Sequence, residues 1–422
     1  MNRGARCVAI LVSSTLLAGG VAQAQGGKSK PPVAQAWIDV ATYSGLGMGE
    51  MGAGMSPMGM LAGALGGNQR NVFGQTMTGA TGSWLDVTLS TRNNPSLEEG
   101  VQLVPAGSKL TPELKLVSPK QEKAPPVADD EQVVREDFEP PKGKIYLYWG
   151  CGNTVRQGQP KVLDMATASP ADLQKFFVGR RATQRGAHLA TGRPSWPNEQ
   201  DSRLVPQGAS LVGEHTFKGQ GVPEGFTFNL GQAQDIMPPL ALQQRDEGGA
   251  TVLAWQGIPA ARAYFMAAMG AKSENEMVFW TSSEVPENGS GLIDYQTNPA
   301  VDRWLKEKVL LSPEARTCTV PQGIFGQGAM VRAIAYGSEI NLAYPPKPAN
   351  PNMSWDPQWA VKVRVKSVAN AMLGMESMGE MPGAGRGSSR PQSQEGSEQA
   401  EGNAMPLGVG QGLKELKGVF GF

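Results

Sequence analysis

Short runs in which apolar and polar residues alternate recur along the chain, and they are densest between residues 250 and 367. Alternation with a period of two is the pattern of a β-strand that has one buried face. Glycine, proline and asparagine separate the runs, which is typical of a sandwich or barrel and not of a parallel α/β sheet. This pattern predicts strands over residues 251–255, 263–267, 277–281, 330–336 and 359–365.

A second β-rich region precedes this one. The same pattern predicts strands over residues 83–90, 101–104, 114–117, 144–149, 211–218 and 225–230. In the first of these runs the apolar positions 85, 87 and 89 predict a core face, and Asp86, Thr88 and Ser90 predict a face in water. Residues 36–43 fit either a single strand or a docking segment.

Two short helices interrupt the strands. Ser169 and Pro170 mark the start of the first helix, and Asn298 and Pro299 mark the start of the second. Helical spacing then predicts two buried stripes, formed by Leu173, Phe176 and Phe177 and by Val301, Trp304, Leu305 and Val309. We expect both helices to lie against a sheet.

The later β-rich region resembles immunoglobulin-like and fibronectin type III domains. Trp255, Pro259 and Tyr264 fall where a strand of those folds passes through a turn into its partner, and residues 333–337 are similar to a late strand. The resemblance covers roughly residues 250–367 and implies a β-sandwich; the second helix is a departure from it. The expected fold is therefore mainly β, with two β-sandwich-like modules and a few short helices.

The N-terminal residues have the features of a secretory signal peptide. Arg3 and Arg6 precede a short apolar run at residues 8–17, and Ala22 and Ala24 form a small-x-small cleavage site. The run is too short for a transmembrane helix, so no membrane-spanning segment is expected after cleavage. The expected location is the periplasm or the cell surface.

Composition sets the remaining domain boundaries. With 54 Gly and 32 Pro in 422 residues, much of the chain is expected to be turn or unpacked segment. The sequence predicts a signal peptide at 1–24, a flexible Met/Gly-rich segment at 25–79, modules at 80–235 and 236–370, and a disordered tail at 371–422. Residues 119–144 of the first module resemble a linker, because proline pairs and contiguous acids interrupt any periodicity.

The net charge and the absence of known catalytic motifs reduce the number of function classes that fit the sequence. Lys plus Arg equals Asp plus Glu at 38 each, which argues against binding nucleic acid. His188 and His215 are the two histidines, and no zinc, P-loop or nucleophile-elbow motif is present. A non-enzymatic structural or interaction role in the bacterial envelope, with a protein or other envelope component as partner, is the favoured interpretation. A carbohydrate-binding or hydrolytic protein is an alternative, with Trp196, Trp355 and Trp359 as candidate sugar-facing rings.

Two methionine clusters form another candidate site. They are Met48, Met51, Met55, Met58 and Met60, and Met372, Met375, Met378 and Met381. Thioether sulfur suits Cu(I), so periplasmic copper(I) binding is a second hypothesis, and the clusters resemble those of periplasmic copper-handling proteins. The alternative is an adaptable apolar contact segment. Cu(I) titration of a variant in which the four methionines of the C-terminal cluster are replaced by leucine distinguishes the two hypotheses. If the variant binds Cu(I) as tightly as the wild type, that cluster is not a copper site.

Cys151 and Cys318 remain after the signal peptide is removed. An even number of cysteines in an exported chain favours a disulfide, which would tie the first module to the second. Two separate buried thiols are the alternative, since free cysteine is among the most buried residue types.

Overall fold

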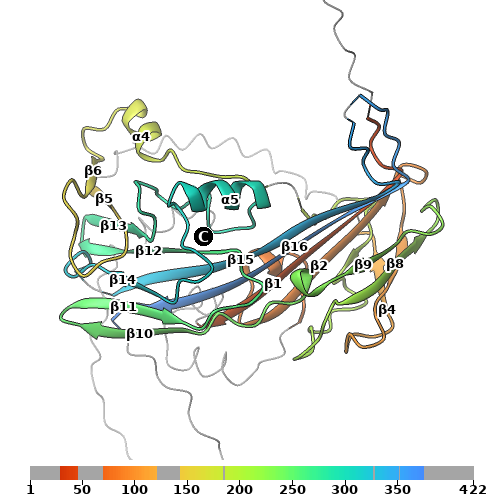
Figure 1. Cartoon of the computed structure of the whole chain (residues 1–422), viewed down its shortest axis with the longest axis horizontal. Helices are drawn as coiled ribbons and strands as arrows, with labels where there is room; N and C mark the ends of the chain where they lie inside the picture. Colours follow the sequence, from red (N-terminus) through yellow and green to blue (C-terminus); the bar gives the residue numbers. More distant parts are fainter. Residues whose placement is uncertain are drawn as a thin grey trace, which may run out of the picture.

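The computed structural model describes residues 29–45, 70–120, 143–183, 186–326, 328–350 and 352–374, and most of its strands belong to one large sheet (Figure 1). In spatial order the thirteen strands are β6, β5, β13, β12, β15, β16, β1, β2, β7, β4, β3, β8 and β9. In the same order their bounds are Lys161–Asp164, Lys144–Trp149, Glu276–Thr281, Ala263–Ser273, Ala329–Tyr344, Trp359–Met372, Ala34–Gly45, Gly82–Thr91, Ser195–Trp196, Glu113–Val117, Glu99–Leu103, Gly213–Gly219 and Thr227–Leu230.

The centre of this sheet joins residues from opposite ends of the chain. Strand β1 pairs in parallel with β16, from Ala34 opposite Trp359 to Gly45 opposite Asn370, and antiparallel with β2. Long antiparallel pairing of β15 with β16 continues the centre. Residues 36–43 therefore form part of a central strand and not a docking segment, because both edges of β1 are hydrogen-bonded.

A smaller sheet covers one face of the large one. It consists of β10 (Leu242–Glu247), β11 (Ala250–Trp255) and β14 (Thr317–Val320). Leu253 and Val320 of this sheet share a hydrophobic core with inward residues of the large sheet such as Val40 and Val363. Because side chains alternate along a strand, the neighbouring residues of β1 and β16 face the other way.

The opposite face of the large sheet is covered by α5 (Asn298–Lys306) and the segments around it (Figure 1). Val301 and Trp304 of α5 pack with Tyr43 and Ile334 of the sheet. Three other short helical turns are α3 (Gln75–Thr78), α4 (Pro170–Phe176) and η1 (Gln232–Gln234). The sheet thus lies between two layers, and both of its faces are buried in the central strands.

The mainly β class with few helices is confirmed. The strands on both sides of residue 236 join the same thirteen-stranded sheet, so the expected pair of immunoglobulin-like sandwiches is not evident in this arrangement. Parallel pairing of β13 with β5 and of β16 with β1 connects the two regions. The hydrogen-bonded sheet and the hydrophobic core between it and the smaller sheet both cross the expected boundary at residue 236.

Both expected helices are present, with differences in detail. Ser169 and Asp172 form a reciprocal capping box at α4, but the side chains expected to be its buried stripe are only half-buried. At α5 the N-cap is Thr297 and not Asn298. The side-chain amide of Asn298 is instead bonded to the backbone of Glu339: its Nδ2 donates to the carbonyl oxygen, and its Oδ1 accepts from the N–H. Because these tertiary hydrogen bonds occupy the Asn298 side chain, the N-cap lies one residue before the predicted position.

Candidate functional site

The face of the sheet beneath α5 carries a row of ionisable side chains. Asp86, Asp39 and Arg364 are direct partners in register on β2, β1 and β16. Residues opposite one another on neighbouring strands have their side chains on the same face, a few ångströms apart. All three are at most 4% exposed. Of the β2 residues that alternation predicted to face water, Asp86 and Thr88 are therefore buried and Ser90 is half-buried.

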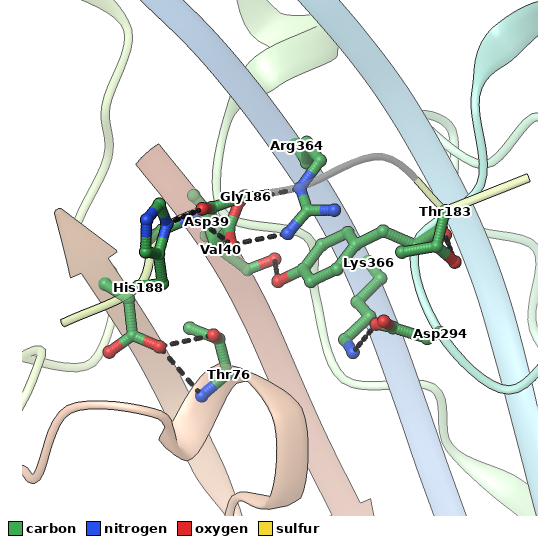
Figure 2. A network of polar contacts seen from close by, with 12 residues as sticks. Asp39, Val40, Thr76, Thr183, Gly186, His188, Asp294, Arg364 and Lys366 are labelled. Atoms are coloured by element: carbon green, nitrogen blue, oxygen red, sulfur yellow. Dashed lines mark hydrogen bonds and ion pairs between the residues drawn. The ribbon is translucent and has the colours of Figure 1, made fainter. Parts of the chain in front are cut away.

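Arg364 and Asp39 form a two-pronged ion pair at the centre of this row (Figure 2). Nε of Arg364 donates to Oδ1 of Asp39 at 2.7 Å, and Nη2 donates to Oδ2 at 2.5 Å. Burial is the largest single influence on the pKa of Arg364 and lowers it, but the hydrogen bonds to Asp39 and the negative charges of Asp39 and Asp294 together raise this pKa above its usual value. Ala187 also donates its backbone N–H to Oδ2 of Asp39 at 3.0 Å.

The loop that covers this pair needs glycine at one position. A Cβ on Gly186 would lie 1.8 Å from Nη2 of Arg364 and 2.4 Å from Oδ2 of Asp39. No side chain fits such a contact without displacing the ion pair. The backbone of the loop therefore seals the pair from solvent directly.

A second ion pair, between Lys366 and Asp294, lies on the same face, two residues beyond Arg364 along β16. Nζ of Lys366 donates to Oδ1 of Asp294 at 2.8 Å, and Lys366 is 2% exposed. Burial is the largest single influence on the pKa of Asp294 and raises it, but the charge and hydrogen bond of Lys366, with smaller contributions from Tyr295 and Arg364, together lower this pKa. The ring of Tyr295 lies 4.3 Å from the guanidinium carbon of Arg364 and 4.1 Å from Nζ of Lys366. One aromatic face thus stabilises both cations.

Asp86 has no cation within ion-pair distance among the described residues, unlike its neighbour Asp39. It accepts hydrogen bonds from the backbone N–H of Gly74 at 3.1 Å and of Thr76 at 3.4 Å, and from the Thr76 hydroxyl. Burial raises its pKa to about 7, helped by the charge of Asp39, and these hydrogen bonds only partly oppose the shift. Asp86 therefore titrates near neutral pH.

The raised pKa of Asp86 gives an expected pH dependence of folding. Below its unfolded pKa of 3.8 this carboxyl is protonated in both states; between 3.8 and about 7 only the folded state holds the proton. Stability from this group therefore falls as pH rises to 7 and is constant above it. In the wild type this group should lower the free energy of unfolding by about 2–3 kcal/mol between pH 5 and pH 8, and the variant Asp86→Asn should not show this decrease.

Urea unfolding of wild type and variant at the two pH values measures this effect. Glu224→Gln, on an exposed loop, is the control and should leave the pH dependence unchanged. A wild-type minus Asp86→Asn difference that is equal at pH 5 and pH 8 would contradict the assignment.

The predicted methionine site is only partly described. Met372 is half-buried in β16 and lies opposite Met330 of β15, and the other eight predicted ligands are outside the described residues. Gly45, the last described residue before the first cluster, pairs with Asn370, two residues before Met372. Gly45 and Met372 thus lie at neighbouring strand ends, and copper(I) binding stays a prediction.

Cys151 and Cys318 are joined by a disulfide, with their sulfur atoms 2.05 Å apart and their Cα atoms 5.1 Å apart. Cys151 follows β5 of the large sheet, and Cys318 lies in β14 of the small one. The bond therefore links the large sheet to the small sheet. From the sequence it was expected to link the first module to the second.

Two of the three tryptophans proposed for sugar binding are buried. Trp196 is fully buried, and Trp359 is 6% exposed and stacks on Phe226 at 4.9 Å. Trp355 alone of the three is half-buried. Trp196 and Trp359 therefore belong to the core and are not exposed rings, and sugar binding by Trp355 stays a prediction.

His215 is a structural residue. It is fully buried, with Nε2 2.7 Å from the carbonyl oxygen of Leu211 and Nδ1 3.1 Å from the amide nitrogen of Gln102. These partners are consistent with a neutral ring protonated on Nε2. Burial lowers the pKa of His215, which favours the neutral form. No group of three or more His, Cys, Asp or Glu that could hold a metal occurs within the described ranges.

The connection between β15 and β16 projects from one end of the large sheet (Figure 1). We call Tyr344, the last residue of β15, together with the described residues of the connection, 345–350 and 352–358, the tip. Tyr344 and Met353 are each 58% exposed there. Trp355 is held in place by its indole N–H, which donates to the carbonyl oxygen of Pro345 at 2.9 Å, and by a backbone bond from Lys30. The tip thus presents apolar side chains on a hydrogen-bonded frame.

Neither a protein-family model nor a curated protein sequence matches this chain. The helices of the described residues are too short or too polar to cross a membrane.

Proposed function

We propose that this is an exported, non-enzymatic protein of the bacterial envelope that binds another envelope protein through the tip. The observation that carries the proposal is the pair of exposed apolar side chains, Tyr344 and Met353, beside a partly exposed tryptophan on a projecting hairpin. Tyrosine, tryptophan and methionine are enriched at protein interfaces. The signal-peptide pattern of residues 1–24 supports export.

The frame of the tip favours binding with little loss of conformational freedom. The backbone N–H of Gln358 donates to the carbonyl oxygen of Tyr344 at 2.6 Å, which closes the base. Nζ of Lys30 lies 2.6 Å from Oδ2 of Asp356, which ties the first described residues to the same loop. A surface ordered before binding loses less entropy when a partner docks. The tip is therefore suited to a protein surface with a complementary apolar pocket.

Affinity capture from envelope extract tests the proposal. The double variant Tyr344→Ser, Met353→Ser should reduce recovery of the captured protein at least tenfold, because the loss of two apolar anchors costs about 1–2 kcal/mol each. Val178→Ser is the matched control, since Val178 is 71% exposed on a different surface. Equal recovery by wild type and the tip variant would refute the tip as the contact surface.

A further inference from the structure

A small pocket lies on the α5 side of the sheet, beside the turn at residues 288–290. Its space is about 20 Å³. The walls include Met269, Phe279, Met330, Arg332, Asn288 and Ser290. A space of this size holds one water-sized or single-atom guest. It is separate from the ion pairs of Asp39 and Asp294.

Arg332 is the only charged wall of this pocket. It is 8% exposed, forms no ion pair with the described residues, and its Nε has no hydrogen-bond partner among them. The other buried cations of the same face, Arg364 and Lys366, each have a carboxylate. A buried guanidinium nitrogen without an acceptor is costly, since this N–H has lost water and gained no partner.

The acidic residue that precedes the turn at residues 288–290 does not supply an anion for Arg332. Glu287 is buried, but its carboxylate binds Nη1 of Arg180 at 3.0 Å and the backbone N–H of Gly289 at 3.1 Å. The ring of Tyr43, 5.9 Å from the guanidinium carbon of Arg332, gives only a distant cation–π contact. The charge of Arg332 is therefore not neutralised within the described part of the chain.

Asn288 adds a second donor to the pocket. Its Oδ1 accepts from the backbone N–H of Ser290 at 2.9 Å and from the Ser290 hydroxyl at 2.7 Å. These bonds fix the orientation of the amide, and Nδ2 has no partner among the described residues. Both orphaned atoms, Nε of Arg332 and Nδ2 of Asn288, are donors. The pocket requires an acceptor.

We propose that this pocket binds a small monovalent anion of the halide class, with chloride as the common candidate. A halide only accepts hydrogen bonds and matches the single positive charge of Arg332. A water molecule would also have to donate two protons; among the wall side chains the Ser290 hydroxyl could accept one, and most of the others are thioether, phenyl and methyl groups, which offer weak acceptors or none. The apolar walls favour weakly hydrated anions, so bromide should bind more tightly than fluoride. This inference is independent of the proposed function.

Thermal unfolding of the mature protein at constant ionic strength tests the site. Sodium bromide and chloride should raise the melting temperature of the wild type relative to sodium fluoride, and the rise should saturate with concentration, because a ligand bound to the folded state stabilises it. Arg332→Met should abolish this difference. Arg245→Met, in an exposed ion pair on β10, should retain it.

Asn288→Asp provides the second variant. It keeps the acceptor oxygen for Ser290 and introduces a carboxylate into the pocket of Arg332, so it should raise the melting temperature in fluoride and lose the response to bromide. Crystals soaked in bromide should show anomalous density beside Arg332. Water alone at that position, or the same bromide response in wild type and Arg332→Met, would overturn the proposal.

Discussion

Replacing Arg364→Met is expected to lower the free energy of unfolding by about 3–5 kcal/mol. The carboxylate of Asp39 would remain 2% exposed with no cation to pair with, and Ala187 would be its main remaining donor. An uncompensated buried charge costs far more than the net contribution of a pair. Urea unfolding at pH 7, monitored by tryptophan fluorescence, measures the loss.

Two further variants show whether the cost arises from the orphaned charge. Asp39→Asn combined with Arg364→Met removes both charges and keeps an acceptor for Ala187, so it should recover most of the lost stability. Arg245→Met breaks an exposed pair and should cost less than about 1 kcal/mol. If Arg364→Met cost no more than Arg245→Met, the pair would not be buried as described.

Removing the disulfide is the second large change. Cys151→Ala with Cys318→Ala should lower the free energy of unfolding by about 5 kcal/mol in the chain-entropy model, because the bond spans 167 residues and restricts the unfolded chain. Alanine is used because Cys318 is 2% exposed and serine would bury a hydroxyl. Unfolding of the oxidised wild type and the variant, with and without reductant, measures the difference.

The same samples contain the control. Reductant should destabilise the wild type and leave the double variant unchanged, and the unreduced, denatured mature protein should show no free thiols. Two free thiols per chain, or a variant as stable as the wild type, would contradict the bond.

Local pattern was enough to predict most strands and both helices. Alternation and turn residues act over a few positions, so β11 and β13 were found within a residue or two. The sheet order was not predictable in the same way. Pairing of β1 with β16 joins residues 325 apart, from Asp39 to Arg364, and nothing near either strand specifies its partner.

The polar site was missed for a related physical reason. Charged residues that alternate with apolar ones in a strand usually face water, so alternation predicts a solvent-exposed face for Asp86. In the fold, Asp39 and Arg364 meet across β1 and β16 and can be buried because each satisfies the other. Opposite charges within alternating strands are the one signal that was available, and a single sequence does not show which strands are neighbours.

The most direct test of the proposed role is site-specific photocrosslinking in the envelope, with a photoreactive residue at position 353 and, separately, at position 178. Both side chains are exposed, but only Met353 belongs to the tip. The expected result is a crosslink from position 353 to the protein recovered by affinity capture, and none from position 178. A crosslink to that protein from position 178 with none from position 353 would contradict binding through the tip.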